Sequence, residues 1–339
     1  MDRGIAKDLP TWHEQQTRDP RRLALGSASW RPSAGVASEP GRFPRDELEA
    51  LIALARGAGI RSIETARAWH ESECAIGEAL GDDPDWRVLT RLAPDVHVDG
   101  LGLGEVLERV SSSLEASRRA LAREALAGLL LHRFAHRHAC GGRIWRMLLA
   151  EREAGRIAAL GVCTATPEEA WAALEDPDIE ILQVATSLLD LRLHRQGFFA
   201  RARELGRSVY VADACLQGLA DLAPESLPSG LDPLGPALEQ IRSLARELEV
   251  PPRAVSLAFV RELPGVRPIM GCKTASQLAE LLGDWESDRV TAAQVLELAA
   301  ALPIHDAVLV DAARWPAPTG PASRDPRQPP SAGIATMPA

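Results

Sequence analysis

The stretch "GIRSIETARAWHESE" (59–73) carries the pattern that decides the fold of this chain. Its short apolar run ends in Glu64, a turn with Trp69 and His70 follows, and a helix-like pattern then begins. So short a run fits a buried strand, whereas apolar residues three and four apart indicate an amphipathic helix. The stretch therefore predicts a strand, a turn and a helix in succession.

The same unit recurs along the chain. Apolar runs lie at 23–29, 60–64, 86–91, 126–132, 157–162, 179–185, 208–213 and 266–271. Helix-like segments lie at 45–57, 72–80, 104–121, 143–154, 167–175, 195–204, 235–248 and 274–283, with an extra one at 251–263. Strand and helix alternating in this way predict an α/β fold, namely a single-domain (β/α)8 TIM barrel. A doubly wound sheet is the runner-up, but the turn "LGSASW" (25–30) lacks the glycine fingerprint of a dinucleotide-binding Rossmann unit.

Composition predicts three segments in the chain and argues against nucleic-acid and membrane partners. We expect an N-terminal extension at 1–21, the barrel at 22–314, and a disordered Pro-rich tail at 315–339, where large apolar residues are scarce. The net charge of −9, without a long basic run, argues against a nucleic-acid partner. No apolar run approaches the roughly 18 residues of a membrane span, so we expect no membrane association. Five cysteines without paired spacing fit a reducing compartment, which predicts a cytoplasmic protein.

Three strand ends carry polar side chains of different chemistry. Active sites of (β/α)8 barrels form where the strands end, and strands two, three and four end at Glu64, Arg91 and His132. Trp69 lies in the loop after strand two. We expect these side chains to meet at the barrel mouth. The alternative is a structural Glu–Arg ion pair beside a core histidine.

The order of the strand-end motifs resembles that of the aldo-keto reductases over about residues 22–285. The motifs are "ETARAWH" (64–70), "LTR" (89–91), "LLLH" (129–132), "GVCT" (161–164), "LQV" (182–184) and "IMGCKTASQLAE" (269–280). The resemblance implies the same barrel, a nicotinamide cofactor, and a catalytic tetrad of Asp, Tyr, Lys and His. In this chain the tetrad positions hold Glu64, Trp69, Arg91 and His132.

The replaced tetrad keeps its charges and loses its proton donor. An indole N–H is not a practical general acid, and a guanidinium with a pKa above 12 stays protonated. Two alternatives to the missing tyrosine remain open. His132 can donate as an imidazolium, or Arg91 and His132 together can stabilise an oxyanion.

The cofactor positions are implied by the same resemblance. Lys273 matches the cation that binds the 2′-phosphate of NADP, which predicts NADPH as the cofactor. The other implied contacts are the helix start at Gly271 and Thr274, the adenine contact Gln277, the carboxamide contacts Gln183 and Thr164, and the loop residues Ala28, Ser29, Leu216 and Gly218. Asp213, Cys163 and Leu281 depart from the family pattern at an aromatic, a serine and an asparagine position.

The remaining candidates concern substrate and metal. Trp30 and Trp69 can line an apolar substrate pocket, and Arg67 can face the substrate, although core packing is the commoner fate of tryptophan. His132, His136, His138 and Cys140 lie within nine residues but match no standard metal motif, so we expect no metal.

These observations predict an NAD(P)H-dependent oxidoreductase that acts on a small carbonyl or hydroxyl compound. Two alternatives remain open. One is a non-redox enzyme on the same scaffold, a lyase or isomerase that uses Glu64, Arg91 and His132. The other is a catalytically silent binding protein.

Overall fold

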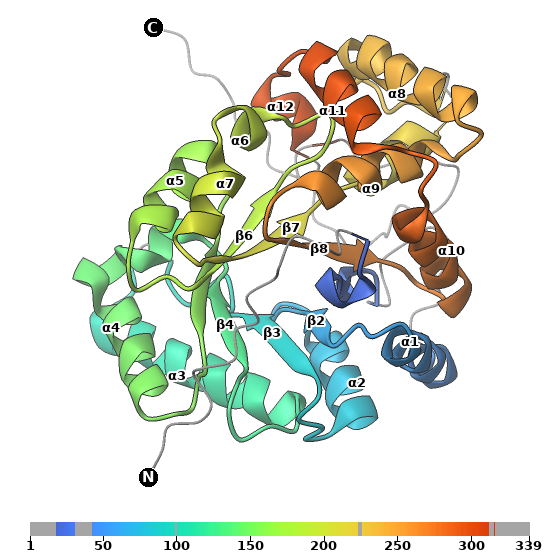
Figure 1. Ribbon diagram of the computed structural model, residues 1–339. Coiled ribbons are helices and arrows are strands. Elements are labelled where there is room, and N and C mark those ends of the chain that lie inside the picture. Colours follow the sequence, from blue (N-terminus) through green and yellow to red (C-terminus); the bar gives the residue numbers. More distant parts are fainter. Residues whose placement is uncertain (1–17, 31–42, 99, 223–225, 312–314, 316–339) are drawn as a thin grey trace, which may run out of the picture.

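Eight parallel strands pair in chain order and close into a barrel (Figure 1). The computed structural model describes residues 18–30, 43–98, 100–222, 226–311 and 315. The strands are β1 (Ala24–Gly26), β2 (Ser62–Glu64), β3 (Arg87–Arg91), β4 (Gly128–Leu131), β5 (Leu160–Cys163), β6 (Ile181–Ala185), β7 (Ser208–Ala212) and β8 (Val266–Gly271). The predicted (β/α)8 barrel is confirmed. Most of the predicted N-terminal extension and tail lies outside the described residues.

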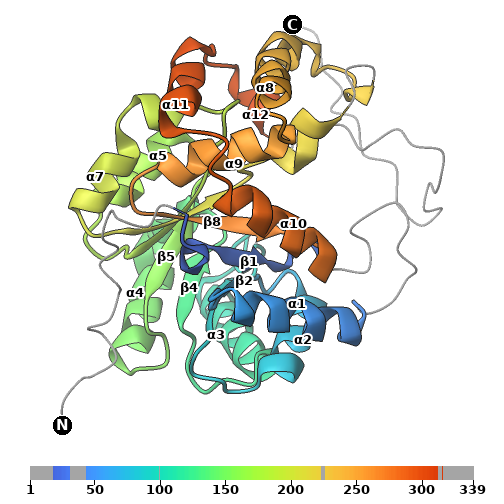
Figure 2. The same cartoon turned by 45° about the vertical axis from the view of Figure 1, so that its right-hand side comes forward.

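Helices surround the barrel. They are α1 (Arg45–Gly57), α2 (His70–Leu80), α3 (Leu103–Ala120), α4 (Ala139–Glu153), α5 (Pro167–Glu175), α6 (Arg192–Arg195), α7 (Phe198–Glu204), α8 (Gly235–Glu247), α9 (Pro252–Glu262), α10 (Ala275–Glu286), α11 (Ala292–Ala301) and α12 (Ala307–Val310). Figure 2 shows α10 beside β8, and α10 packs against both α1 and α9. The C-terminal helix α11 also packs on α9, so α9 joins the barrel to the end of the chain.

Threonine side chains mark where several helices begin. Thr166, Thr274 and Thr291 precede α5, α10 and α11, and each hydroxyl accepts a hydrogen bond from the backbone N–H three residues on. Such caps satisfy one of the donors that a helix start leaves unpaired. Gly77 sets a different constraint, because a Cβ atom there would collide with the Ala120 carbonyl where α2 crosses the end of α3.

The structure differs from the sequence prediction in the helix at 195–204, at the start of α4 and in two additional helices. The predicted helix at 195–204 is two helices, because Gly197 adopts a left-handed backbone (φ 75°) between α6 and α7. The left-handed residues 140–142 interrupt the start of α4, so its regular part begins near the predicted residue 143. The helices α11 and α12 were not predicted.

Buried side chains fill the barrel interior. They come from five of the strands and from the residue before β5, and they are Ala24, Leu89, Leu130, Ala159, Ile181 and Tyr210. Tyr210, the sole tyrosine of the chain, is 1% exposed and its hydroxyl lies 3.3 Å from the Ser62 hydroxyl. This filled interior confines any chemistry to the rim.

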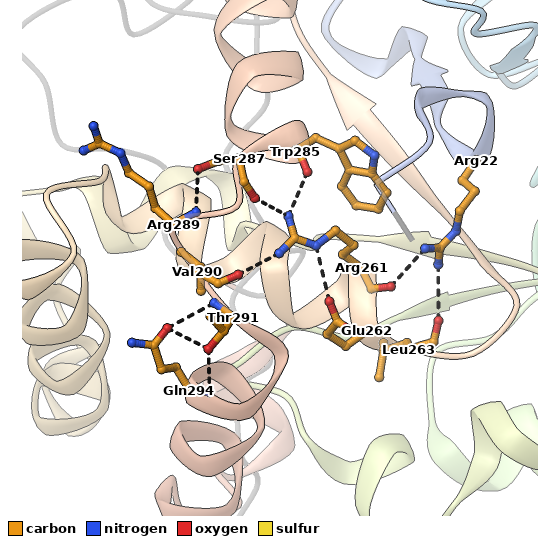
Figure 3. A network of polar contacts seen from close by, with 10 residues as sticks. All are labelled: Arg22, Arg261, Glu262, Leu263, Trp285, Ser287, Arg289, Val290, Thr291 and Gln294. Atoms are coloured by element: carbon orange, nitrogen blue, oxygen red, sulfur yellow. Dashed lines mark hydrogen bonds and ion pairs between the residues drawn. The ribbon is translucent and has the colours of Figure 1, made fainter. Parts of the chain in front are cut away.

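Two buried arginines anchor the C-terminal helices at the opposite end of the barrel (Figure 3). Arg261 is 1% exposed and donates to the carbonyls of Trp285, Ser287 and Val290 at 2.8 to 2.9 Å. Arg22 in turn donates to the Arg261 carbonyl at 3.0 Å. These cations satisfy carbonyls that the ends of α9 and α10 leave without a helical partner.

No helix in the described part of the chain is long and apolar enough to cross a membrane.

Candidate active site

The predicted polar strand ends meet at one rim of the barrel. Because all strands are parallel, Glu64 at the end of β2, Arg91 at the end of β3 and Gly271 at the end of β8 share this rim. His132 follows β4 directly. Strand register places Glu64 opposite Leu89 and therefore two residues behind Arg91. The structure therefore brings these strand ends together, and their role in catalysis stays a prediction.

Glu64 and Arg91 form a buried ion pair. The Arg91 Nε atom lies 2.9 Å from Glu64 Oε1, with 13% and 4% of the two side chains exposed. The N–H bond does not point at that oxygen, so the contact is an ion pair without a well-aligned hydrogen bond. Burial raises the pKa of Glu64, and the attraction of Arg91 opposes this shift without cancelling it. The pair keeps an acid and a permanent cation at the rim.

Trp69 covers the cation of this pair. The centroid of its indole ring lies 4.3 Å from the Arg91 Cζ atom, a cation–π contact. Backbone hydrogen bonds hold the loop that carries Trp69: the Thr65 N–H donates to the Leu89 carbonyl at 2.8 Å and the Arg67 N–H to the Arg91 carbonyl at 2.9 Å. The loop thus continues the pairing of β2 with β3 before the helix begins.

Two further side chains complete the network. Cys163, at the end of β5, donates its thiol hydrogen to Gln183 Oε1 at 3.3 Å. With that oxygen occupied, the Gln183 amide N–H group is the one that hydrogen-bonds Glu64. Arg91 also contacts the Cys163 thiol, whose pKa burial raises to about 12. Cys163 was not predicted as a site residue, although its place at a strand end was a usable signal.

His132 is a neutral imidazole at this rim. Burial first, and then the charges of Arg91, Arg133 and His136, lower its pKa to about 4. Its Nδ1 atom is buried without a hydrogen-bond partner among the described residues. These surroundings oppose the imidazolium form, so the expectation that His132 donates as an imidazolium near neutral pH needs correction. A neutral imidazole still carries one N–H donor.

Two of the expected substrate contacts are wrong. Trp30 is 0% exposed and donates its indole N–H to the Cys272 carbonyl at 2.8 Å, so it belongs to the core. The Ser29 hydroxyl donates to the same carbonyl at 3.0 Å. Arg67 pairs at 2.5 Å with Glu73, a fully buried residue of α2, so its guanidinium is engaged within the protein. Of the three predicted substrate contacts, Trp69 is the one whose side chain lies on the rim residue Arg91.

The predicted phosphate site lies at the start of α10, where Lys273 precedes the capping residue Thr274. Gln277 is used locally, since its Oε1 accepts from the Lys273 N–H at 2.8 Å. The Ala275 N–H donates to the carboxylate of Glu47 from α1 at 2.5 Å. A carboxylate of the chain itself therefore occupies a donor that a phosphate can use.

The loop residues of the implied cofactor site lie in short helical turns. Ala28 and Ser29 form the turn after β1, and Leu216 and Gly218 form the turn after β7. Gly218 has a positive φ of 81°, and a Cβ atom there would meet open space. The Thr164 N–H donates to the Gln183 carbonyl at 3.0 Å, which joins the ends of β5 and β6.

The histidine-rich loop shows no metal site. Among the described residues, which include His132, His136, His138 and Cys140, no three potential ligands are grouped closely enough to hold an ion. His136 is buried and lies edge-on to His97, with ring centroids 6.2 Å apart. These imidazoles pack against other rings and do not converge on a common point.

A closed parallel barrel whose polar strand ends meet at one rim has the architecture of a TIM-barrel enzyme. The family model of the aldo/keto reductase family matches residues 22–302, and the chain belongs to this family. Its members are oxidoreductases that generally use NAD(P)H.

Solved structures of the same fold are only distantly similar in sequence. A glycerol dehydrogenase from Gluconobacter oxydans is 20% identical, with a TM-score of 0.64 over 84% of this chain and 94% of that one. The holo form of an aldo-keto reductase from Bacillus halodurans is 18% identical, with a TM-score of 0.65 over the same shares. No curated protein sequence matches the chain. At these identities the similarity supports the fold alone.

Proposed function

We propose that this protein is an NAD(P)H-dependent oxidoreductase that acts on a small carbonyl or hydroxyl compound. Family membership supports the reaction type. The observation that carries the proposal for this chain is the arrangement at the rim, where Arg91 and His132 lie beside each other with donors available. A guanidinium and a neutral imidazole N–H are both suited to bind the oxygen of a polarised carbonyl.

The two donors divide the work in this proposal. Arg91 supplies a permanent positive charge, and His132 supplies a directional N–H donor that carries no charge. Together they stabilise the negative charge that develops on the substrate oxygen, as an oxyanion hole does. When bound, the nicotinamide supplies the hydride. Trp69 cannot supply the proton, so the oxygen takes its proton from solvent.

Glu64 fixes the position of the Arg91 guanidinium. Paired with Glu64, Arg91 is held at the rim and cannot turn freely toward the substrate. Gln183 in β6 and Cys163 in β5 support Glu64 and Arg91 from across the barrel mouth. A rigid donor that needs no rearrangement during the reaction contributes most to lowering the barrier.

Lys273 makes NADPH the preferred cofactor in this proposal. It lies at the start of α10, where helix N–H groups and a cation suit a phosphate. Open space at Gly218 and Gly271 leaves room for the backbone to approach the nucleotide. Gln183 fits less well, because its amide already bonds Glu64 and Cys163 and must exchange a partner to bind a carboxamide.

That commitment of Gln183 favours a second candidate, a lyase or isomerase that uses Glu64, Arg91 and His132 without a nicotinamide. The silent binding protein has no such observation in its favour. The five free thiols of the described residues support the proposal of a cytoplasmic location.

Titration with NADPH tests the leading proposal before any substrate is known. Saturable binding supports it, and a preference over NADH supports the role of Lys273. Aldehyde reduction by the double variant Trp69→Tyr/Arg91→Lys, which restores the family tetrad at two positions, is a further test. Binding of neither nucleotide favours the second candidate.

A further inference from the structure

Glu73 is a buried carboxylate outside the rim network. It lies in the first turns of α2 and is 0% exposed. Its Oε1 atom accepts from the Thr90 hydroxyl at 2.6 Å and from the Ser117 hydroxyl at 2.8 Å. Its Oε2 atom accepts from Arg67 at 2.5 Å. A carboxylate this buried is costly unless its oxygens are satisfied, and here both are.

The donors to Glu73 are neighbours of the two residues that stack at the rim. Thr90 directly precedes Arg91 in β3. Arg67 lies two residues before Trp69 in the loop after β2. One carboxylate therefore holds both the strand that carries the guanidinium and the loop that carries the indole. Ser117, from α3, fixes that carboxylate to the outer helices.

We propose that Glu73 is a positioning residue that sets the Trp69–Arg91 stack. This inference rests on the proposed function only for its consequence in catalysis, because the stack itself is a feature of the structure. The Glu73 backbone N–H donates to the Trp69 carbonyl at 3.1 Å, but the partners of its carboxylate are Arg67, Thr90 and Ser117. The carboxylate acts through Arg67 and Thr90, which place the two stacked groups.

Glu73→Gln separates the charge from the shape of this side chain. The amide oxygen can still accept from Thr90 and Ser117. The amide nitrogen, however, presents hydrogens to the Arg67 guanidinium, which is itself only a donor. Arg67 then loses its partner and the loop with Trp69 is released, while the fold keeps its two hydroxyl contacts.

The indole N–H signal of Trp69 reports the stack directly. In a nitrogen–proton correlation spectrum, Trp69→Phe identifies this signal among those of the eight tryptophans. We expect Glu73→Gln to move or broaden it while the signals of the buried Trp145 and Trp285 stay in place. The matched control is Glu71→Gln, the same change at an exposed residue of the same helix turn, which should leave all signals unchanged.

A purely structural role predicts a different result. Glu73→Gln would then lower the unfolding midpoint while the folded protein kept the Trp69 signal at its wild-type position, and this outcome overturns the proposal. If Glu73→Gln does not fold, Arg67→Met replaces it. That variant leaves Glu73 bonded to Thr90 and Ser117, and it must also move the Trp69 signal if the proposal holds.

Measuring NADPH binding distinguishes a failure of the proposed oxidoreductase function from a failure of the positioning role of Glu73. The donors to the Glu73 carboxylate are Arg67, Thr90 and Ser117, none of which belongs to the start of α10, so NADPH affinity in Glu73→Gln should stay within about twofold of the wild type. Once a substrate is found, kcat should fall on the order of 10- to 100-fold, as expected for misplaced donors. A wild type that binds no NADPH refutes the oxidoreductase but leaves the spectral test intact.

Discussion

The Trp69 indole lies on the guanidinium of Arg91, with its ring centroid 4.3 Å from Cζ, while the edge of the same guanidinium pairs with Glu64 at 2.9 Å. The cation is thus covered on one face and held at one edge. A side chain so confined can offer only its remaining N–H groups to a ligand, which makes the direction of these donors the main property of the rim.

The buried ion pair should matter for stability. Glu64→Ala leaves Arg91 buried without its counter-charge, and removing one partner of such a pair costs about 3–5 kcal/mol in the free energy of unfolding. Glu105→Ala is the control, because Glu105 pairs with Arg109 on an exposed helix face where such a pair contributes about 0.3–0.5 kcal/mol. Urea denaturation measures both. Equal losses in the free energy of unfolding would show that the buried Glu64–Arg91 pair stabilises the fold no more than an exposed pair does.

The arginine anchor of the C-terminal helices gives a second stability prediction. Arg261→Met leaves two buried carbonyls and one part-buried carbonyl without this donor, and we expect a loss of about 2–4 kcal/mol. Arg289→Met changes an exposed arginine nearby and should stay within about 0.5 kcal/mol. A stability of Arg261→Met as high as that of Arg289→Met contradicts the role of the anchor.

The lowered pKa of His132 makes stability depend on pH. Between pH 6.5 and about 4 the unfolded chain binds a proton at this position and the folded chain does not. Stability therefore falls as the pH falls through this window, by on the order of 1–2 kcal/mol after allowing for contact with solvent. His132→Phe removes this contribution, so its unfolding midpoint should depend less on pH in the same window. If the variant and the wild type lose stability equally over this window, the pKa of His132 is not lowered in the folded protein.

His132 should also be required for turnover. His132→Phe removes the N–H donor and keeps a ring of similar size, so folding and NADPH binding should persist while kcat falls by at least about 100-fold, the value of one oxyanion donor. The measurement is steady-state kinetics on whatever carbonyl substrate a screen provides. Full activity in this variant would contradict the proposal that His132 and Arg91 together stabilise the substrate oxygen.

Glu47 should oppose phosphate binding at the start of α10. Glu47→Gln weakens the negative charge that now accepts from the Ala275 N–H, so NADPH affinity should rise about threefold relative to NADH. Glu49→Gln, on an exposed part of the same helix, is the control. An equal change for both nucleotides would place Glu47 outside the phosphate site.

The sequence predicted the strand ends well because strand alternation fixes which residues face a barrel rim. Glu64, Arg91 and His132 are where that rule places them. The directions of loop side chains were not predictable in the same way. Arg67 pairs with Glu73, a buried carboxylate of α2. Trp30 is buried and donates its indole N–H to the Cys272 carbonyl. Both partners lie on other elements of the fold.

Burial is the other quantity that the sequence did not supply. His132 looked like an imidazolium at neutral pH, and only its enclosure beside Arg91 shows that its pKa is lowered. Cys163 was noted only as a departure from the family pattern at a serine position, yet its thiol links Gln183 to Arg91. The helices α11 and α12 were missed because they follow the last strand–helix unit and so lie outside the alternation used for the prediction; α11 packs on α9.

Calorimetric titration of the wild type and of Lys273→Ala with NADPH and NADH tests the central claim most directly. The account predicts saturable binding of NADPH to the wild type, weaker binding of NADH, and loss of most of that preference in Lys273→Ala, because Lys273 is the cation beside the helix start that suits the extra phosphate. Absence of binding by either nucleotide to the folded wild type would contradict it.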